Sequence, residues 1–144
     1  MASPPTQPRG DLLRAVIFLP LGLCLLLVTY SMVEARASFL AQALRADGHV
    51  SALNAGGSHP QIDFIDATGQ AFSYPEDGLI YGYAVGDPVS VRYQAEAPAR
   101  TAIIEDRGAL WGACLLVGLF AVVATAGGGY HLAAWIRRRR SARP

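Results

Sequence analysis

A long uncharged segment near the C-terminal end constrains this chain most. Residues 109–136 contain no Asp, Glu, Lys or Arg, and an uncharged apolar run of that length is typical of a membrane-spanning helix. The next four residues are all arginine: Arg137, Arg138, Arg139 and Arg140. Because arginine is costly to move across a bilayer, this end of the span is expected in the cytoplasm. This arginine cluster, which opens the predicted basic cytoplasmic tail 137–144, can also bind anionic lipid headgroups.

A second uncharged run lies near the N-terminus. Residues 15–33 carry no charge and are bounded by Arg14 and Glu34. As a helix this run would extend about 28 Å, close to the ~30 Å thickness of the hydrocarbon layer. A cleaved signal peptide is the alternative, since 35–37 reads Ala-Arg-Ala, but the run is longer than a usual signal core. We predict an uncleaved transmembrane helix after a disordered cytoplasmic leader, 1–14.

The charges are distributed unevenly along the chain. Residues 1–33 and 109–144 together hold seven Arg and one acid, whereas 34–108 hold five Arg and ten acids. Arginine therefore flanks one side of both predicted spans, which predicts cytoplasmic termini and an outward-facing middle segment. All twelve basic residues are arginine, a bias typical of GC-rich bacterial genomes. The expected location is the bacterial inner membrane, with the middle segment in the periplasm or outside the cell.

The middle segment changes from a helical to an extended pattern. Apolar spacing predicts an amphipathic connector helix over 34–47, stopped by Asp47-Gly48. Short extended stretches then follow between turn residues, and 61–66 with 70–74 reads as a β-hairpin. The other expected strands are 50–53, 79–84, 89–93 and 101–105, with a loop at 54–58. The predicted fold class is membrane α + β, with two transmembrane helices flanking a small all-β barrel- or sandwich-like domain, 48–108.

Glycines within and beside the second span bear on how it packs. Gly127-Gly128-Gly129 is expected to loosen the inner end of the helix, so that 130–140 can lie on the membrane surface. Gly108 and Gly112 form a G-x-x-x-G pair, which in membranes can mark a dimerisation face. Because this pair straddles the expected membrane edge, we interpret it as chance.

The most specific motif is the segment 83–93, Tyr-Ala-Val-Gly-Asp-Pro-Val-Ser-Val-Arg-Tyr. Together with 48–50 and 66–74, it resembles the VGD-x-V-x-V-x-Y signature of the bacterial domain-of-unknown-function family 3592, although 94–98 keep only the final Pro of the usual continuation. The resemblance implies membrane helices with a small extracytoplasmic β-domain, and it implies no activity. The motif residues Gly86, Asp87, Val89, Val91 and Tyr93 are expected to be structural, with the last three on the core face of one strand.

The sequence contains no catalytic constellation. His49, His59 and His131 are far apart, and no metal-binding or phosphate-binding spacing is present. We therefore expect no catalytic residue, cofactor, metal or nucleic-acid partner. The predicted function is a non-enzymatic integral membrane protein whose periplasmic β-domain binds another protein, of accessory or immunity type. The alternative is a component of a membrane transport or enzyme system that uses His131 or the outer carboxylates.

The topology can be tested with fusions to alkaline phosphatase, which becomes active only where its disulfides can form. We expect a fusion after Pro144 to be inactive and a fusion at Ser73 to be active, because the arginine excess keeps both termini inside. The reverse pattern would contradict the predicted orientation.

Overall fold

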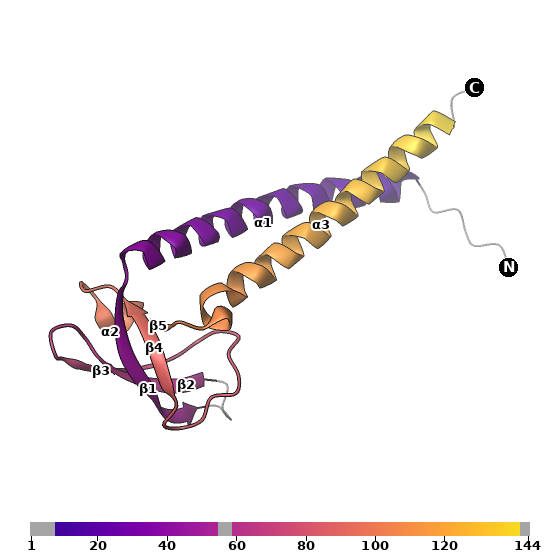
Figure 1. Ribbon diagram of the computed structural model, residues 1–144. Helices are drawn as coiled ribbons and strands as arrows, with labels where there is room; N and C mark the ends of the chain where they lie inside the picture. Colours follow the sequence, from indigo (N-terminus) through magenta and orange to yellow (C-terminus); the bar gives the residue numbers. More distant parts are fainter. Residues whose placement is uncertain (1–7, 55–58, 142–144) are drawn as a thin grey trace. The chain divides into compact units, whose positions relative to one another are not determined.

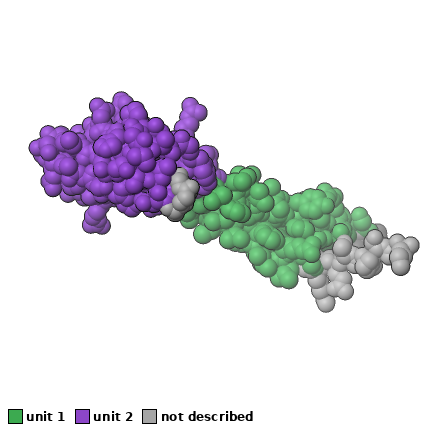
Figure 2. Space-filling view, turned by 90° about the horizontal axis from the view of Figure 1, so that it is seen from below, with its two compact units in different colours: residues 1–31, 116–144 green, residues 32–115 purple. Residues whose placement is uncertain are grey.

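The computed structural model describes residues 8–54 and 59–141, so the predicted leader is covered only from residue 8 and the loop at 54–58 only at its first residue. The chain forms two compact units (Figure 2). One unit combines residues 1–31 with 116–144, and the other is residues 32–115. Each unit is described by itself below.

Two long helices, α1 (Pro8–Gln42) and α3 (Arg107–Ser141), run near the two ends of the chain. Both are long and apolar enough to cross a membrane. Helix α1 continues through Pro20 and begins inside the predicted leader, so the disorder expected for residues 8–14 is wrong. It ends at Gln42, which makes the predicted connector helix too long. Residues 44–47 instead pair with strand β4, because ladder hydrogen bonds override their local helical preference.

Small residues bring α1 and α3 together within the first unit. A Cβ atom added at Gly22 would lie 2.3 Å from the hydroxyl oxygen of Thr125, and one added at Gly128 would lie 2.7 Å from the backbone nitrogen of Leu19. Such close backbone approach is typical of glycine at helix contacts in membranes. Helix α3 passes through Gly127–Gly129 without a break, so the predicted loosening of its inner end is wrong.

The second unit contains one antiparallel sheet in the order β3-β2-β1-β4-β5 (Figure 1). Its strands are β1 (Leu44–Asn54), β2 (His59–Ile65), β3 (Ala71–Pro75), β4 (Pro88–Tyr93) and β5 (Ile103–Ile104). The predicted hairpin is confirmed as β2 and β3, with Gly69 in its turn at φ +85°. The sheet curls into a half-barrel whose two edge strands are not paired with each other, so it is neither a closed barrel nor a two-sheet sandwich.

One face of the sheet forms the core of the second unit. The side chains of Val50, Ile62 and Val91 are fully buried, and the Phe64 ring lies 5.4 Å from the ring of Tyr93. The inward and outward side chains of 89–93 therefore alternate as predicted. Val91 and Tyr93 are buried, and Val89 is partly buried and packs against the core. The Tyr93 hydroxyl also accepts a hydrogen bond of 2.8 Å from the Ala67 backbone, which ties the strand to the hairpin turn.

Two of the predicted strands differ in the structure. Residues 79–84 form an irregular loop, flanked and interrupted by Gly78 (φ +123°) and Gly82 (φ +86°). The strand expected at 101–105 is reduced to β5, because the helical turn α2 (Pro98–Thr101) comes immediately before it. In both segments backbone geometry set by glycine and proline outweighs the apolar pattern.

The Gly108 and Gly112 pair has a packing role within this unit. A Cβ atom at Gly108 would lie 1.7 Å from the carbonyl oxygen of Leu79, and one at Gly112 would lie 3.2 Å from the Leu79 Cβ atom. Both glycines therefore make room for the 79–84 loop against the start of α3. Asp106 caps this helix start, since its Oδ1 accepts a 2.7 Å hydrogen bond from the Gly108 N–H. The G-x-x-x-G spacing of Gly108 and Gly112, which we interpreted as chance, is thus explained by the contact of both glycines with Leu79.

A matched pair of substitutions tests the inward and outward faces. Val91→Asp would bury a charge at a fully buried position and cost several kcal/mol, about enough to unfold a small domain. Ile65→Asp makes the same kind of change at a side chain that is 60% exposed on the same sheet, and should cost less than about 1 kcal/mol. Limited proteolysis of the full chain in membranes should cleave only the Val91 variant faster than the unsubstituted chain. Equal resistance of both variants would mean that the faces are assigned wrongly.

Candidate functional site

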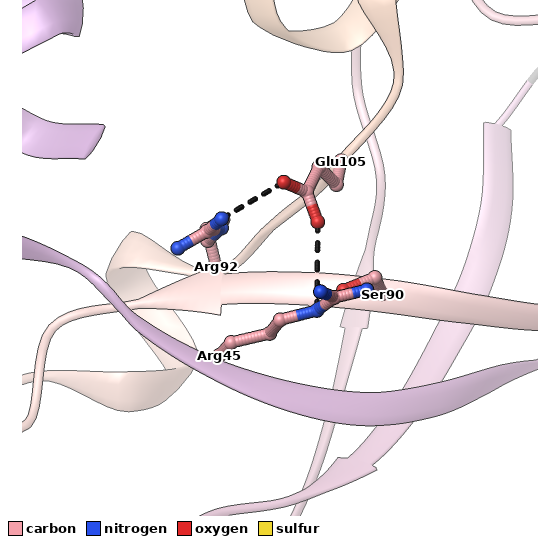
Figure 3. Close-up of polar contacts among 4 residues, drawn as sticks. All are labelled: Arg45, Ser90, Arg92 and Glu105. Atoms are coloured by element: carbon pink, nitrogen blue, oxygen red, sulfur yellow. Dashed lines mark hydrogen bonds and ion pairs between the residues drawn. The ribbon is translucent and has the colours of Figure 1, made fainter.

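The solvent-facing side of the sheet carries an arginine–carboxylate cluster (Figure 3). Arg45 on β1 and Arg92 on β4 are direct cross-strand partners, a pairing that like charges destabilise. Glu105 lies between them: its carboxylate is 2.9 Å from Arg92 Nη2 and 3.6 Å from Arg45 Nε. Arg45 Nε also donates a 2.6 Å hydrogen bond to the Ser90 hydroxyl. The carboxylate therefore holds two cations side by side at the surface.

The carboxylate of this cluster is ionised at neutral pH. The hydrogen bond from Arg92, and then the one from Ser90, lower the pKa of Glu105. These side chains are substantially exposed, so their ion pairs contribute at most about 1 kcal/mol each to stability. The cluster is better suited to presenting an ordered charge pattern to a partner than to holding the fold together.

A second polar cluster crosses β1, β2 and β3. The Oδ1 atom of Asp63 accepts hydrogen bonds from the hydroxyls of Ser51, at 2.9 Å, and Ser73. Ser73 in turn accepts a 2.8 Å hydrogen bond from Gln61 Nε2. The Ser73 bond is the main cause that lowers the pKa of Asp63, so this carboxylate is ionised at neutral pH. The cluster thus gives this end of the sheet an ordered negative charge.

A hollow of about 600 Å³ lies over this part of the sheet. Its rim includes Asp47, His49 and Asp63, and the exposed apolar side chain of Ile65 lies among them. Beside it runs the open edge of β3, where the hairpin register turns the backbone groups of Ala71 away from β2. Charged side chains around an exposed apolar residue, next to a free strand edge, are features of protein-binding surfaces. We call this side of the sheet, including the Glu105 cluster, the polar sheet face.

Glu76 is a buried acid that sequence reasoning missed. It is only 3% exposed, and its Oε2 atom accepts a 2.9 Å hydrogen bond from the Tyr74 hydroxyl and a 2.7 Å bond from the Ile104 N–H. Glu76 directly follows β3 and Ile104 belongs to β5, so this carboxylate joins the two edges of the sheet. Burial raises the pKa of Glu76 to about 7, against the opposing effect of its hydrogen bonds. No sequence pattern marks a Glu between Pro75 and Asp77 as buried.

The family-motif residues form a turn and a strand, and most of them lie away from the polar sheet face. Gly86 has φ +94°, and its N–H bonds the carbonyl of Val50 at 2.8 Å. Asp87 closes the turn by accepting a 2.7 Å hydrogen bond from the Ala84 N–H. Val91 and Tyr93 point into the core on the opposite side of β4. These contacts give the motif a conformational role.

His131 has a partner within the first unit. Its Nδ1 atom lies 3.3 Å from Oδ1 of Asp11, which is only 6% exposed. Arg138 reaches the other oxygen of the same carboxylate at 3.4 Å. The carboxylate of Asp11 thus contacts two residues of α3 within the first unit. Arg139 lies over the Trp135 ring at 4.4 Å, while the predicted basic cluster otherwise continues the exposed end of α3.

The described residues bear on two kinds of chemistry, metal binding and cysteine reactivity. Within residues 8–54 and 59–141, no three His, Cys, Asp or Glu side chains are placed to hold a metal ion. Cys24 and Cys114 are free thiols. The described residues that stand out are instead a polar sheet face, a buried acid and an interhelical carboxylate.

These features define a class of protein: a small curled β-sheet that lies between two apolar helices in the sequence, with a polar face suited to contact with other proteins. The chain is similar to a protein of Pseudomonas aeruginosa described as "Immune protein Tsi4", with 52% identity over 118 residues that cover 79% of this chain and 81% of the relative. The chain therefore belongs to the family of Tsi4. No protein-family model matches it, and no solved structure matches it.

The buried acid predicts an unusual pH dependence of stability. At pH 5 a folded Glu76, with a pKa of about 7, keeps its proton, whereas in the unfolded chain a Glu with an ordinary pKa of 4.5 has largely lost it. The folded state is therefore destabilised as pH rises from 4.5 to 7, by at most about 3 kcal/mol. Thermal unfolding of the full chain in detergent, followed by near-ultraviolet circular dichroism, should show a lower Tm at pH 8 than at pH 5. Glu76→Gln should flatten this dependence; an equally steep dependence in that variant would assign it to another group.

Proposed function

We propose that this protein is an immunity protein of the bacterial inner membrane that binds and neutralises a toxin through the polar sheet face. The observation that carries the proposal is the 52% identity to the immune protein Tsi4 across most of both chains. Neutralisation by binding requires no catalytic group, which fits a non-enzymatic protein.

The membrane arrangement is part of the proposal. Two helices of sufficient length and apolarity support two spans, and the arginine excess at the ends supports cytoplasmic termini. The β-domain would then face the periplasm, where it could meet a toxin before the cytoplasm is reached. The resemblance to domain-of-unknown-function family 3592 implies the same arrangement and stays a prediction.

The polar sheet face is the most suitable docking surface for three reasons. Its charges are ordered by hydrogen bonds before a partner arrives, which lowers the entropic cost of binding. Ile65 offers an apolar contact that is 60% exposed within the polar surround. The free edge of β3 can also accept an extended segment of a partner by strand addition. Because cations and carboxylates both occur on this face, charge complementarity can select one toxin over others.

The alternative of a transport or enzyme component finds no specific support. The alternative would depend on His131. The Nδ1 atom of His131 on α3 lies 3.3 Å from Oδ1 of Asp11 on α1, so this residue contacts the other helix. Buried polar partners of this kind are expected to fix how two helices pack. We therefore assign His131 a structural role in the proposal.

Immunity can be tested in the bacterium that carries this protein. A strain lacking the protein should be outcompeted when grown in contact with its parent, and the full-length protein should restore survival. Equal survival of the deletion strain under conditions in which the parent kills other bacteria would contradict the immunity proposal.

Two matched variants test the docking surface. Ile65→Arg places a cation in the polar sheet face at a side chain that is 60% exposed, and it should abolish protection by disturbing the contact. Val85→Arg makes a similar change at a side chain that is 61% exposed in the loop before β4, and it should leave protection intact. Both variants should accumulate to normal levels in the membrane fraction. Loss of protection by the Val85 variant alone would place the contact elsewhere on the domain.

A further inference from the structure

A hollow beside two arginines lies within the second unit. It has a volume of about 480 Å³, and its lining includes Arg36 of α1 and Arg100 of α2. Met32, Ala35 and Phe39 supply an apolar wall from α1, and Cys114 supplies part of the wall from α3. Among the described residues that line this hollow, none is acidic. We call it the headgroup hollow.

The two arginines differ from those of the polar sheet face. Arg45 and Arg92 both pair with Glu105, whereas neither Arg36 nor Arg100 has an ion-pair partner among residues 8–54 and 59–141. The Arg36 guanidinium lies over the Phe39 ring, 5.9 Å from its centre, which orients it without neutralising it. Two cations line this hollow, and no carboxylate is among its described lining residues, which are features that favour an anion. Guanidinium groups match the geometry of phosphate oxygens especially well.

The position of the hollow along the sequence identifies the source of the phosphate. Met32 is the second-last residue of the uncharged run 15–33, and Arg36 follows it by four residues. Cys114 lies near the start of the uncharged run 109–136. In the proposed topology the hollow is therefore at the level of the lipid headgroups on the periplasmic side. An arginine at that level can place its guanidinium beside the phosphates while its stem remains on the apolar wall.

We propose that the headgroup hollow binds the phosphate group of an anionic phospholipid in the outer leaflet of the inner membrane. Arg36 and Arg100 hold the phosphate, and the first carbons of the lipid contact Met32 and Cys114. The neighbouring hollow shares both arginines but is also lined by Glu76 and Asp77, so the phosphate occupies the acid-free side. The bound lipid sets the depth of the β-domain at the membrane surface. This inference rests on the proposed membrane location, but not on the proposed immunity function.

The test is photocrosslinking of the full chain in nanodiscs of phosphatidylcholine and phosphatidylglycerol. A phosphatidylglycerol probe with a diazirine in its headgroup should label residues 32–39 or 98–114, as located by peptide mass spectrometry. The double variant Arg36→Gln/Arg100→Gln should reduce labelling of these segments about tenfold or more. It should leave labelling of 137–140 unchanged. The matched variant Arg139→Gln/Arg140→Gln removes two cations from the basic tail. It should reduce labelling of 137–140 and leave labelling of 32–39 and 98–114 unchanged.

Several outcomes would overturn the proposal. Undiminished labelling of 32–39 and 98–114 in the Arg36/Arg100 variant would show that the arginines do not hold the lipid. Equal labelling by a phosphatidylcholine probe would exclude selection for anionic lipid, and loss of the label in millimolar inorganic phosphate would identify a site for free phosphate. Should the Gln variant lose protease resistance, Arg36→Lys/Arg100→Lys keeps both charges and is expected to retain the label. Loss of the label in that folded variant would contradict the proposal. Because the readout is lipid labelling, a failed co-culture test of immunity does not affect it.

Discussion

The two edge strands of the sheet, β3 and β5, are held near each other by the carboxylate of Glu76 and not by a ladder of backbone bonds. Its Oε2 atom binds the backbone N–H of Ile104 and the hydroxyl of Tyr74, both in the interior. A curled sheet of only five strands would otherwise have one buried donor on β5 without a partner, at a cost of about 1–3 kcal/mol. The core enclosed by the curl, from Val50 to Tyr93, depends on this closure. This link also has a cost, because ionisation of the buried Glu76 carboxyl destabilises the folded domain.

With the core satisfied on one face, the other face of the same strands is available for function. The half-barrel has a core on its inner side only, so alternate residues on β1, β2 and β4 are free to carry charge. Hydrogen bonds and ion pairs arrange them into the Glu105 and Asp63 clusters, which contribute little to stability and much to the pattern seen by a partner. An immunity protein of the kind proposed needs this property, because a preformed charge pattern allows it to recognise one toxin and ignore others.

The helix pair in the first unit follows a different packing rule. Small residues bring its two backbones close together, and the fully buried Ala121 lies in line with Gly128 and Thr125 on α3. In lipid, close van der Waals packing takes the place of the hydrophobic effect as the force between helices. The buried acid Asp11 lies against His131 and Arg138 within this unit, so its carboxylate has partners on the other helix. These contacts would let the two helices form one stable anchor for the β-domain.

The sequence by itself determined the features that depend on local pattern. Charge-free length defined both apolar helices, and the Asp66–Gly69 turn with its flanking alternation defined the β2–β3 hairpin and the inward residues of β4. Only the tertiary structure decided the features that depend on partners distant in the chain. Residues 44–47 became strand because β4 pairs with them, Gly108 and Gly112 accommodate Leu79, and Glu76 became a buried link because Ile104 lies opposite it. Local periodicity records which face of a segment is apolar, whereas hydrogen-bond partners that are far apart in sequence leave no periodic trace, so they emerge only when the chain is folded.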